Sequence, residues 1–182
     1  MDHERCPACG FDGARLDDGE LLGALRALGG DWHGLLVACG TDVRVRPEPD
    51  TWSALEYAAH SRDVTSLHVF GVEQALRLDE PSFPAIDGEA LISSAAPSYL
   101  DADPDQVVKA LGEEAGRLAQ LADEAGRGAW GRGLTIGESR LDVRRLLEHA
   151  LHDSRHHLGD VERGRAEIEA ARARRSTETA SS

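Results

Sequence analysis

The chain has 182 residues, 41% hydrophobic and 29% charged, which is typical of a soluble globular protein with one domain and at most a small appendage. Its net charge of −13 at pH 7 argues against a nucleic-acid partner, because phosphate binding needs a basic patch. There is no run of about 18 apolar residues, no sustained period-two pattern and no signal-peptide pattern, so we expect a cytoplasmic, mainly helical protein without a membrane span.

The first element is a cysteine turn near the N-terminus. Cys6 and Cys9 form a CPxCG sequence, in which two thiolates converge and Gly10 permits a tight backbone turn. The turn predicts a zinc knuckle, but tetrahedral zinc needs two further ligands from elsewhere. The alternatives are a reduced knuckle without metal and a redox pair. Because three cysteines do not form a disulfide framework, we expect a reducing compartment.

The first long helix is predicted at residues 18–38, where apolar residues recur at helical spacing. Cys39 continues the apolar stripe, so we expect it to be a core thiol and not a third zinc ligand. Residues 40–50 contain two prolines and form a connection.

A second helix is predicted at residues 51–76. Glu56, His60 and Asp63 lie along the edge of its apolar face at helical spacing. A histidine in such a place is often a hydrogen-bonded core residue, so His60 alone is only a candidate ligand. His68 points away from this face, and we expect it to be exposed to solvent.

Residues 78–103 are rich in proline, serine and aspartate and are expected to form a long loop that could roof a pocket. A third helix then begins at Asp103 and Pro104, with aspartate as the N-cap and proline in the first turn. Residues 126–137 form a glycine-rich link, which does not match a phosphate-binding loop.

The fourth helix begins near Asp142 and continues past Val161, and it holds half of the eight histidines between His149 and His157. At about 100° per residue, Asp153 and His157 fall on the inward, apolar face. Burial of a carboxylate and an imidazole is costly unless they are paired or bound to a metal. This pair therefore indicates a site in the bundle interior.

A third ligand for this pair should come from another helix, and His60 has a suitable orientation. Two histidines and one carboxylate leave open metal positions for water or substrate. Zinc is the default metal, and iron, nickel or copper would also be accommodated. Glu56 and Asp63 are candidates to support His60 from the same helix edge, around a core site of His60, Asp153 and His157.

The polar flank of the fourth helix offers a second site. His152 and His156, four residues apart, could join Cys6 and Cys9 in a structural zinc site of two thiolates and two imidazoles. The spacing of His152 and His156 also fits the core site in a register one residue earlier. Two further histidines are candidates for the knuckle: His3 and His149.

Four helices of about 20 residues with long connections predict an all-α four-helix bundle. We expect a CxxC knuckle extension at residues 1–14, the bundle at 15–165, and a charged helix end with a disordered tail at 166–182. Disorder is expected from Ser176 onward.

Two stretches resemble the DinB-like superfamily: residues 52–63, WSALEYAAHSRD, and residues 152–161, HDSRHHLGDV. The resemblance covers about residues 15–165. Within the superfamily, the subgroup with mycothiol-dependent maleylpyruvate isomerases is most similar. Members are four-helix bundles that hold a divalent metal through a histidine on the second helix and a ligand-x3-His pair on the last.

The resemblance puts His60 in the first of these roles and Asp153 with His157 in the second. Asp160 falls where the isomerases carry an acid three residues after the ligand histidine. Aspartate stands here in place of the usual glutamate or histidine.

The resemblance implies a metal-dependent transferase or isomerase that uses a low-molecular-weight thiol, such as mycothiol, with a small-molecule substrate. A metal would lower the thiol pKa and raise the fraction of reactive thiolate. The alternative is a non-catalytic, zinc-stabilised bundle that serves as a binding or dimerisation module. Under either reading the chain could form a homodimer, and the sequence does not define its interface.

Overall fold

Four long helices form a bundle, as the apolar periodicity of the sequence predicts. The computed structural model describes residues 3–180. The bundle helices are α1 (Asp18–Cys39), α2 (Ala54–Arg77), α4 (Pro104–Ala125) and α5 (Val143–Ala180). The predicted all-α four-helix bundle is confirmed, and the helix ends differ from the predicted ones by a few residues.

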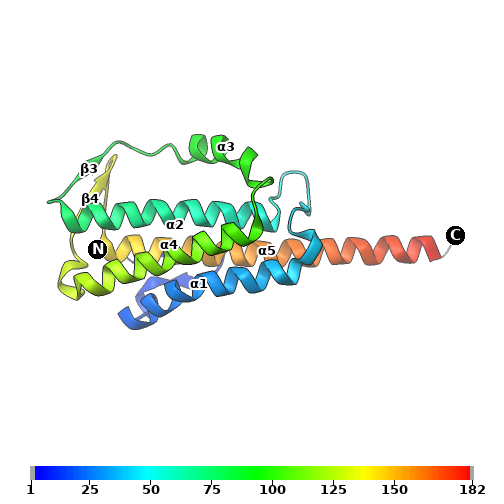
Figure 1. The fold of residues 1–182 in the computed structure, drawn as a ribbon, viewed down its shortest axis with the longest axis horizontal. Helices are drawn as coiled ribbons and strands as arrows, with labels where there is room; N and C mark the ends of the chain where they lie inside the picture. Colours follow the sequence, from blue (N-terminus) through cyan, green and yellow to red (C-terminus); the bar gives the residue numbers. More distant parts are fainter. Residues whose placement is uncertain (1–2, 181–182) are drawn as a thin grey trace.

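The helices surround the core in the order α1, α4, α2 and α5, with α5 packed against α1 to close the ring. Figure 1 shows that α1 and α5 run in one direction and that α2 and α4 run in the other. The neighbours α2 and α4 are therefore parallel. Parallel neighbours cannot be joined by a short turn, so the chain must return along the full length of the bundle between them.

This return is the segment, residues 78–103, whose sequence predicts a loop. It contains the short strand β3 (Ser82–Phe83) and the helix α3 (Gly88–Tyr99). The Asp87 side chain caps α3 by accepting a hydrogen bond of 3.0 Å from the backbone N–H of Ala90. The expectation of an unstructured loop is wrong here, because one proline, Pro97 in the last turn, does not prevent a helix before it.

A hairpin connects α4 to α5. Strands β4 (Gly133–Ile136) and β5 (Ser139–Asp142) pair antiparallel, and β3 adds to β4 in parallel. Gly137 takes φ of +59° in the hairpin turn, a conformation that glycine adopts without strain. The predicted glycine-rich link therefore contains a strand of a small sheet.

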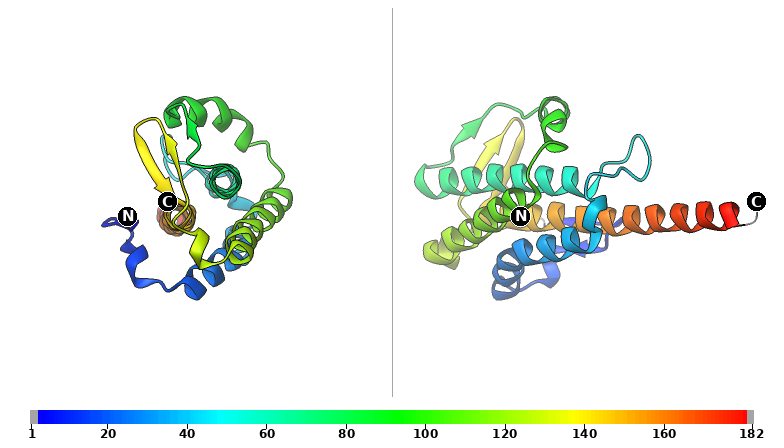
Figure 2. Two further views of the ribbon diagram at one scale, coloured as in Figure 1. Left: turned by 90° about the vertical axis from the view of Figure 1, so that its left-hand side faces the viewer. Right: turned by 45° about the vertical axis from the view of Figure 1, so that its right-hand side comes forward.

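The N-terminal segment forms the predicted knuckle. Strands β1 (Arg5–Cys6) and β2 (Phe11–Asp12) pair antiparallel around the CPxCG turn. Figure 2 shows the N-terminal segment on the α5 side of the bundle. Short 3-10 turns complete the elements: Gly13–Arg15, Gly40–Asp42 and Arg127–Ala129.

The core lies between the four helices and is mostly leucine and alanine. Trp32 of α1 is fully buried in it and donates a hydrogen bond of 2.7 Å from Nε1 to Ser154 Oγ of α5. Cys39 is partly buried against this core, as its place in the apolar stripe predicts. None of the described helices has a stretch long and apolar enough to cross a membrane.

The end of α5 differs from the expected disordered tail. Helix α5 continues to Ala180 and extends beyond the other helices (Figure 1). Alanine, arginine and glutamate, which favour helix, make up most of the sequence before Ser176 and carry the helix forward. The last two residues of the predicted tail, Ser181 and Ser182, lie outside the described residues.

Candidate metal centre

The antiparallel helices α2 and α5 bring the predicted core site together. A capping box starts α2: Ser53 Oγ accepts from the backbone N–H of Glu56, and the Glu56 carboxylate accepts from the backbone N–H of Ser53. This start places His60 toward α5. On α5, Asp153 and His157 lie one turn apart and face it.

The three side chains converge on one small volume. His60 Nε2 lies 3.8 Å and His157 Nε2 3.6 Å from Asp153 Oδ1, and one candidate ligand atom from each residue lies within 4.8 Å of the others. The side chains of His60, Asp153 and His157 are 11%, 17% and 19% exposed. Asp153 Oδ2 is buried and has no hydrogen-bond partner among the described residues. A buried oxygen of this kind is costly unless a cation or a donor is added.

His157 is held in one orientation. Its Nδ1–H donates a hydrogen bond of 2.8 Å to Asp160 Oδ2, which leaves Nε2 facing Asp153. The ring also stacks on Tyr57, with ring centroids 4.9 Å apart. A carboxylate behind a ligand histidine fixes the ring tautomer in many metal sites. Asp160 therefore occupies the place that the resemblance indicates for an acid.

The surroundings of Asp153 and His157 shift the pKa values of both side chains. Burial raises the pKa of Asp153, but the neighbouring imidazoles of His157 and His60 outweigh burial and hold the pKa well below its ordinary value. Burial lowers the pKa of His157, but Asp153 and Asp160 outweigh it and raise the pKa above its ordinary value. Asp153 is thus anionic at neutral pH, the state in which a carboxylate can bind a metal.

Aromatic side chains enclose the His60 end of the site. The Trp52 ring lies 5.4 Å from His60 and 6.0 Å from Tyr99 of α3, centroid to centroid. The Tyr99 hydroxyl donates a hydrogen bond of 2.9 Å to Asp63 Oδ2. The return segment is therefore anchored beside the site by its last helix.

The predicted support of His60 by Glu56 and Asp63 is not found. Glu56 is fully buried and bonds Arg46 and the N-cap serine, while Asp63 bonds Tyr99 and Arg62. Helical spacing places both carboxylates on the same edge as His60. Helical spacing does not show that Arg46 and Tyr99, from other segments, bind these two carboxylates.

The other predicted cluster also forms. Candidate ligand atoms of Cys6, Cys9, His152 and His156 lie within 4.8 Å of one another, and all three cysteines of the chain are reduced. A hydrogen bond with the Cys9 backbone and one with His156 outweigh burial and lower the pKa of the Cys6 thiol to about 7. The two ligand pairs on α5 therefore belong to different clusters. His152 and His156 face the knuckle, and Asp153 and His157 face α2.

The two other candidate histidines have different partners. His3 Nδ1 donates to Glu148 Oε1 at 2.7 Å, and His149 Nδ1 lies 3.0 Å from His68 Nε2. His68 Nδ1–H donates to the Val64 carbonyl, so its Nε2 accepts from His149. Neither His3 nor His149 joins the knuckle cluster.

His68 is buried, so the expectation that it is exposed is wrong. Burial and the nearby His149 lower the pKa of His68 to about 4, which keeps its ring neutral. The sequence could not show this, because the segment that covers this part of α2 comes from the return connection and the hairpin.

A cavity of about 610 Å³ lies beside this histidine pair, between α2, α5 and the small sheet. Its wall is mainly apolar, with Phe70, Leu134 and Leu146 on it. Phe83 and Ile86 of the return segment close one side. The prediction that this segment roofs a pocket is confirmed.

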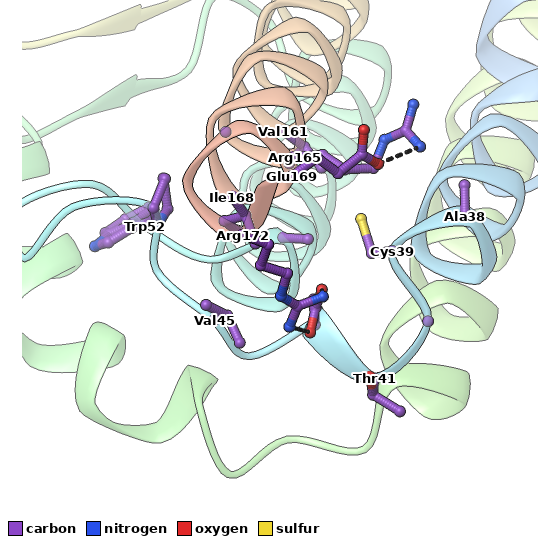
Figure 3. Close-up of a pocket in the computed structure, with 15 residues that line it drawn as sticks. Ala38, Cys39, Thr41, Val45, Trp52, Val161, Arg165, Ile168, Glu169 and Arg172 are labelled. Atoms are coloured by element: carbon purple, nitrogen blue, oxygen red, sulfur yellow. Dashed lines mark hydrogen bonds and ion pairs between the residues drawn. The ribbon is translucent and has the colours of Figure 1, made fainter. Parts of the chain in front are cut away.

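A second cavity, of about 310 Å³, lies where α1 ends and α2 begins (Figure 3). Trp52, which contacts His60, forms part of its wall. Its lining is more polar: Arg165 pairs with Glu169, and Arg172 pairs with Asp42. The core cluster therefore lies between an apolar cavity at one end of the α2–α5 pair and a polar one at the other.

The comparisons with known proteins concern the bundle. A family model described as the DinB superfamily matches residues 20–161. No curated protein matches the chain. Among solved structures, YfiT from Bacillus subtilis matches with a TM-score of 0.72 and 16% identity, over 84% of this chain and 87% of that one. It is described as a probable metal-dependent hydrolase with an unusual four-helix bundle topology. At this identity the likeness shows the fold.

Proposed function

This chain belongs to the DinB superfamily, and from that premise we propose that it is a metal-dependent enzyme whose metal is held by His60, Asp153 and His157. The observation that carries the proposal is the convergence of two imidazoles and one carboxylate between α2 and α5.

The donor set fits a divalent cation. Ligand atoms around one such ion lie about 3–3.5 Å apart when metal–ligand bonds are about 2.1 Å long. The nitrogen–oxygen distances of 3.6 and 3.8 Å need only small side-chain movements to reach this range. Asp153 Oδ2, which has no hydrogen-bond partner among the described residues, would gain an electrostatic partner in the cation. Zinc is the first metal to test, and iron, nickel or copper also suit the set.

Three protein ligands leave positions open for a reactant. A divalent metal bound there supplies a Lewis acid that lowers the pKa of a coordinating thiol or water. The residues of this chain would hold that centre in place: Asp160 orients the ring of His157, and the rings of Trp52 and Tyr57 lie against His60 and His157.

We propose that the reaction is a transfer or isomerisation with a low-molecular-weight thiol, such as mycothiol, as cosubstrate. The resemblance of the two ligand-bearing helices to the maleylpyruvate isomerases supports this choice. The second candidate is hydrolysis, with water as the nucleophile, and the description of YfiT favours it.

The apolar cavity is our candidate site for the apolar part of the substrate. His68, which borders it, lies eight residues along α2 from His60, or about 12 Å at 1.5 Å per residue. A substrate with its apolar part in the cavity and its reacting group at the metal centre would therefore be about 12 Å long. The cavity volume of about 610 Å³ is ample for such a group.

The test measures turnover of monochlorobimane, an apolar acceptor that fluoresces on conjugation, with mycothiol as the thiol. We expect thiol-dependent turnover in the wild type, background turnover in His60→Ala, and unchanged turnover in His33→Ala, an exposed histidine on α1. Ser139→Trp, at the cavity wall, should raise KM for the acceptor and keep the metal.

A parallel assay with p-nitrophenyl acetate separates the two reactions. Hydrolysis that needs His60 but no thiol would replace the transferase proposal by the hydrolase. Equal rates in the wild type and His60→Ala in both assays would count against an enzyme and favour the non-catalytic binding or dimerisation module. A cytoplasmic location, the substrate and a homodimer stay predictions from the sequence.

A further inference from the structure

The N-terminal knuckle is the part of the described chain that the DinB function leaves unexplained. Its cysteines precede residues 20–161, which match the family model. It packs on α5 through polar contacts: Glu4 pairs with Arg145 at 2.7 Å and with His152 at 3.1 Å. A short two-stranded ribbon is marginally stable alone, so a metal ion shared with α5 would add to the stability that these contacts give it.

The turn directs both thiols to one side. The backbone N–H of Gly10 donates to the Cys6 carbonyl at 2.9 Å, and Gly10 takes φ of +74°. Cys6 pairs with Phe11 across the ribbon. This tight loop brings Cys9 back beside Cys6, which is the arrangement of a zinc knuckle.

Helix α5 supplies two imidazoles to the same point. His152 and His156 are one turn apart, with ring centroids separated by 5.7 Å and ring planes at 89°. His156 Nδ1 lies 3.7 Å from Cys6 Sγ. In a tetrahedral zinc site, with Zn–S of about 2.3 Å and Zn–N of about 2.0–2.1 Å, sulfur and nitrogen lie about 3.6 Å apart. The two atoms are thus already at ligand spacing.

The far side of each ring faces a carboxylate. His152 Nδ1 faces Glu4, while its Nε2 is buried and has no hydrogen-bond partner among the described residues. His156 Nε2 lies 3.8 Å from Asp160. Histidine ligands of zinc commonly present one nitrogen to the metal and the other to a carboxylate or carbonyl. Neither nitrogen of His152 has a hydrogen-bond partner among the described residues, so a metal ion would supply one of these buried nitrogens with a partner.

We propose that Cys6, Cys9, His152 and His156 bind a structural zinc ion that fastens the N-terminal knuckle to α5. Four protein ligands fill a tetrahedral shell, so the site has no position for substrate. It is separate from the open core centre and does not depend on the proposed reaction.

The position of this site gives it a second consequence. His152 precedes Asp153, and His156 precedes His157, so the two ligand pairs alternate along the same turns of α5. Asp160 contacts both His156 and His157. Zinc in the knuckle would therefore fix the helical turns that present the core ligands.

The first test replaces zinc by cobalt, whose thiolate bonds give a charge-transfer band in the near ultraviolet and whose tetrahedral sites absorb visible light. We expect both signals in the wild type and in His60→Ala/His157→Ala. We expect loss of the thiolate band and of about one metal per chain in Cys6→Ser/Cys9→Ser. Cys39→Ser, which removes the remaining thiol, is the matched control and should keep both.

The second test needs no variant and so does not depend on folding of the serine form. Zinc should slow alkylation of Cys6 and Cys9 in the wild-type chain, as mass spectrometry of the modified peptides would show, and should leave Cys39 unaffected. Equal alkylation rates with zinc and with a chelator, or a cobalt form without a thiolate band, would overturn the zinc site. Neither result would bear on the core centre.

Discussion

Asp160 is the one described carboxylate that contacts a histidine of each cluster. It accepts a hydrogen bond from His157 at 2.8 Å and lies 3.8 Å from His156, and Arg163 pairs with its other oxygen. A carboxylate in this place sets which nitrogen of the ligand histidine is free. Its effect should therefore appear in metal affinity before it appears in folding.

Asp160→Asn should weaken metal binding at the core centre by about 10–100-fold, because the amide no longer orients the His157 ring as strongly. The measurement is competition with a chromogenic chelator in a Cys6→Ser/Cys9→Ser background, so that only the core metal is counted. Glu162→Gln changes an exposed carboxylate on the same helix and should leave the affinity unchanged. Equal affinities for the two variants would contradict the role of Asp160.

Glu56 gives a prediction for the effect of pH on stability. Burial raises its pKa, but hydrogen bonds from Arg46 and Ser53 outweigh burial and hold the pKa below its ordinary value. A group whose pKa is lower in the folded state adds stability that is complete above the unfolded pKa, about 4.3, and is lost as pH falls toward the folded pKa.

The difference in melting temperature between the wild type and Glu56→Gln should therefore be largest near neutral pH and shrink below about pH 4. Differential scanning fluorimetry across this range would measure it. A difference that stays constant with pH would show that the charge of Glu56 does not stabilise the fold.

At the scale of the elements, α1 and α4 approach each other through glycine. A Cβ built at Gly29 of α1 would lie 2.7 Å from the Cα of Gly112 of α4, a distance that real contacts do not reach. Gly30, the next residue, has nothing within 4 Å of such a Cβ. The two neighbouring positions therefore differ only in whether a helix lies against them.

Gly29→Ala should destabilise the bundle by about 1–3 kcal/mol, since it forces the helices apart. Gly30→Ala should stabilise it by about 0.5–1 kcal/mol, since alanine favours the helix and meets no neighbour. Urea denaturation of the two variants beside the wild type measures both. Shifts of the same sign would be inconsistent with the close approach of α1 and α4.

The elements also show where sequence reasoning succeeds and where it fails. The four bundle helices follow from apolar periodicity, because each buries a stripe against its neighbours. The sequence predicts a loop and a link where helix α3 and the hairpin form, since prolines lie before and within α3 and the strands are only four residues long. The burial of His68 depends on these segments and could not be predicted without them.

At the scale of the whole molecule, the direction of the helices decides which residues meet. The spacing of Asp153 and His157 predicts one face of one helix, and the family resemblance supplies His60 as their partner. That α2 lies antiparallel beside α5, with α4 on its other side, is a long-range fact of topology. No local pattern in the sequence encodes the partner of a helix face.

The same topology separates the two clusters. His60 lies against the side of α5 that faces α2, and the knuckle lies against another side of α5. Spacing alone admits two registers of ligand pairs on α5, His152 with His156 and Asp153 with His157. The fold assigns each register to a different neighbour, so one helix can serve an open centre and a closed one.

The most direct test of the central claim is elemental metal analysis of the purified wild-type chain beside His60→Ala/His157→Ala and Cys6→Ser/Cys9→Ser. We predict that each double variant loses about one metal per chain and keeps the other. If His60→Ala/His157→Ala retained the full metal content of the wild type, the core centre would not be a metal site. The proposed enzyme would then lose its basis.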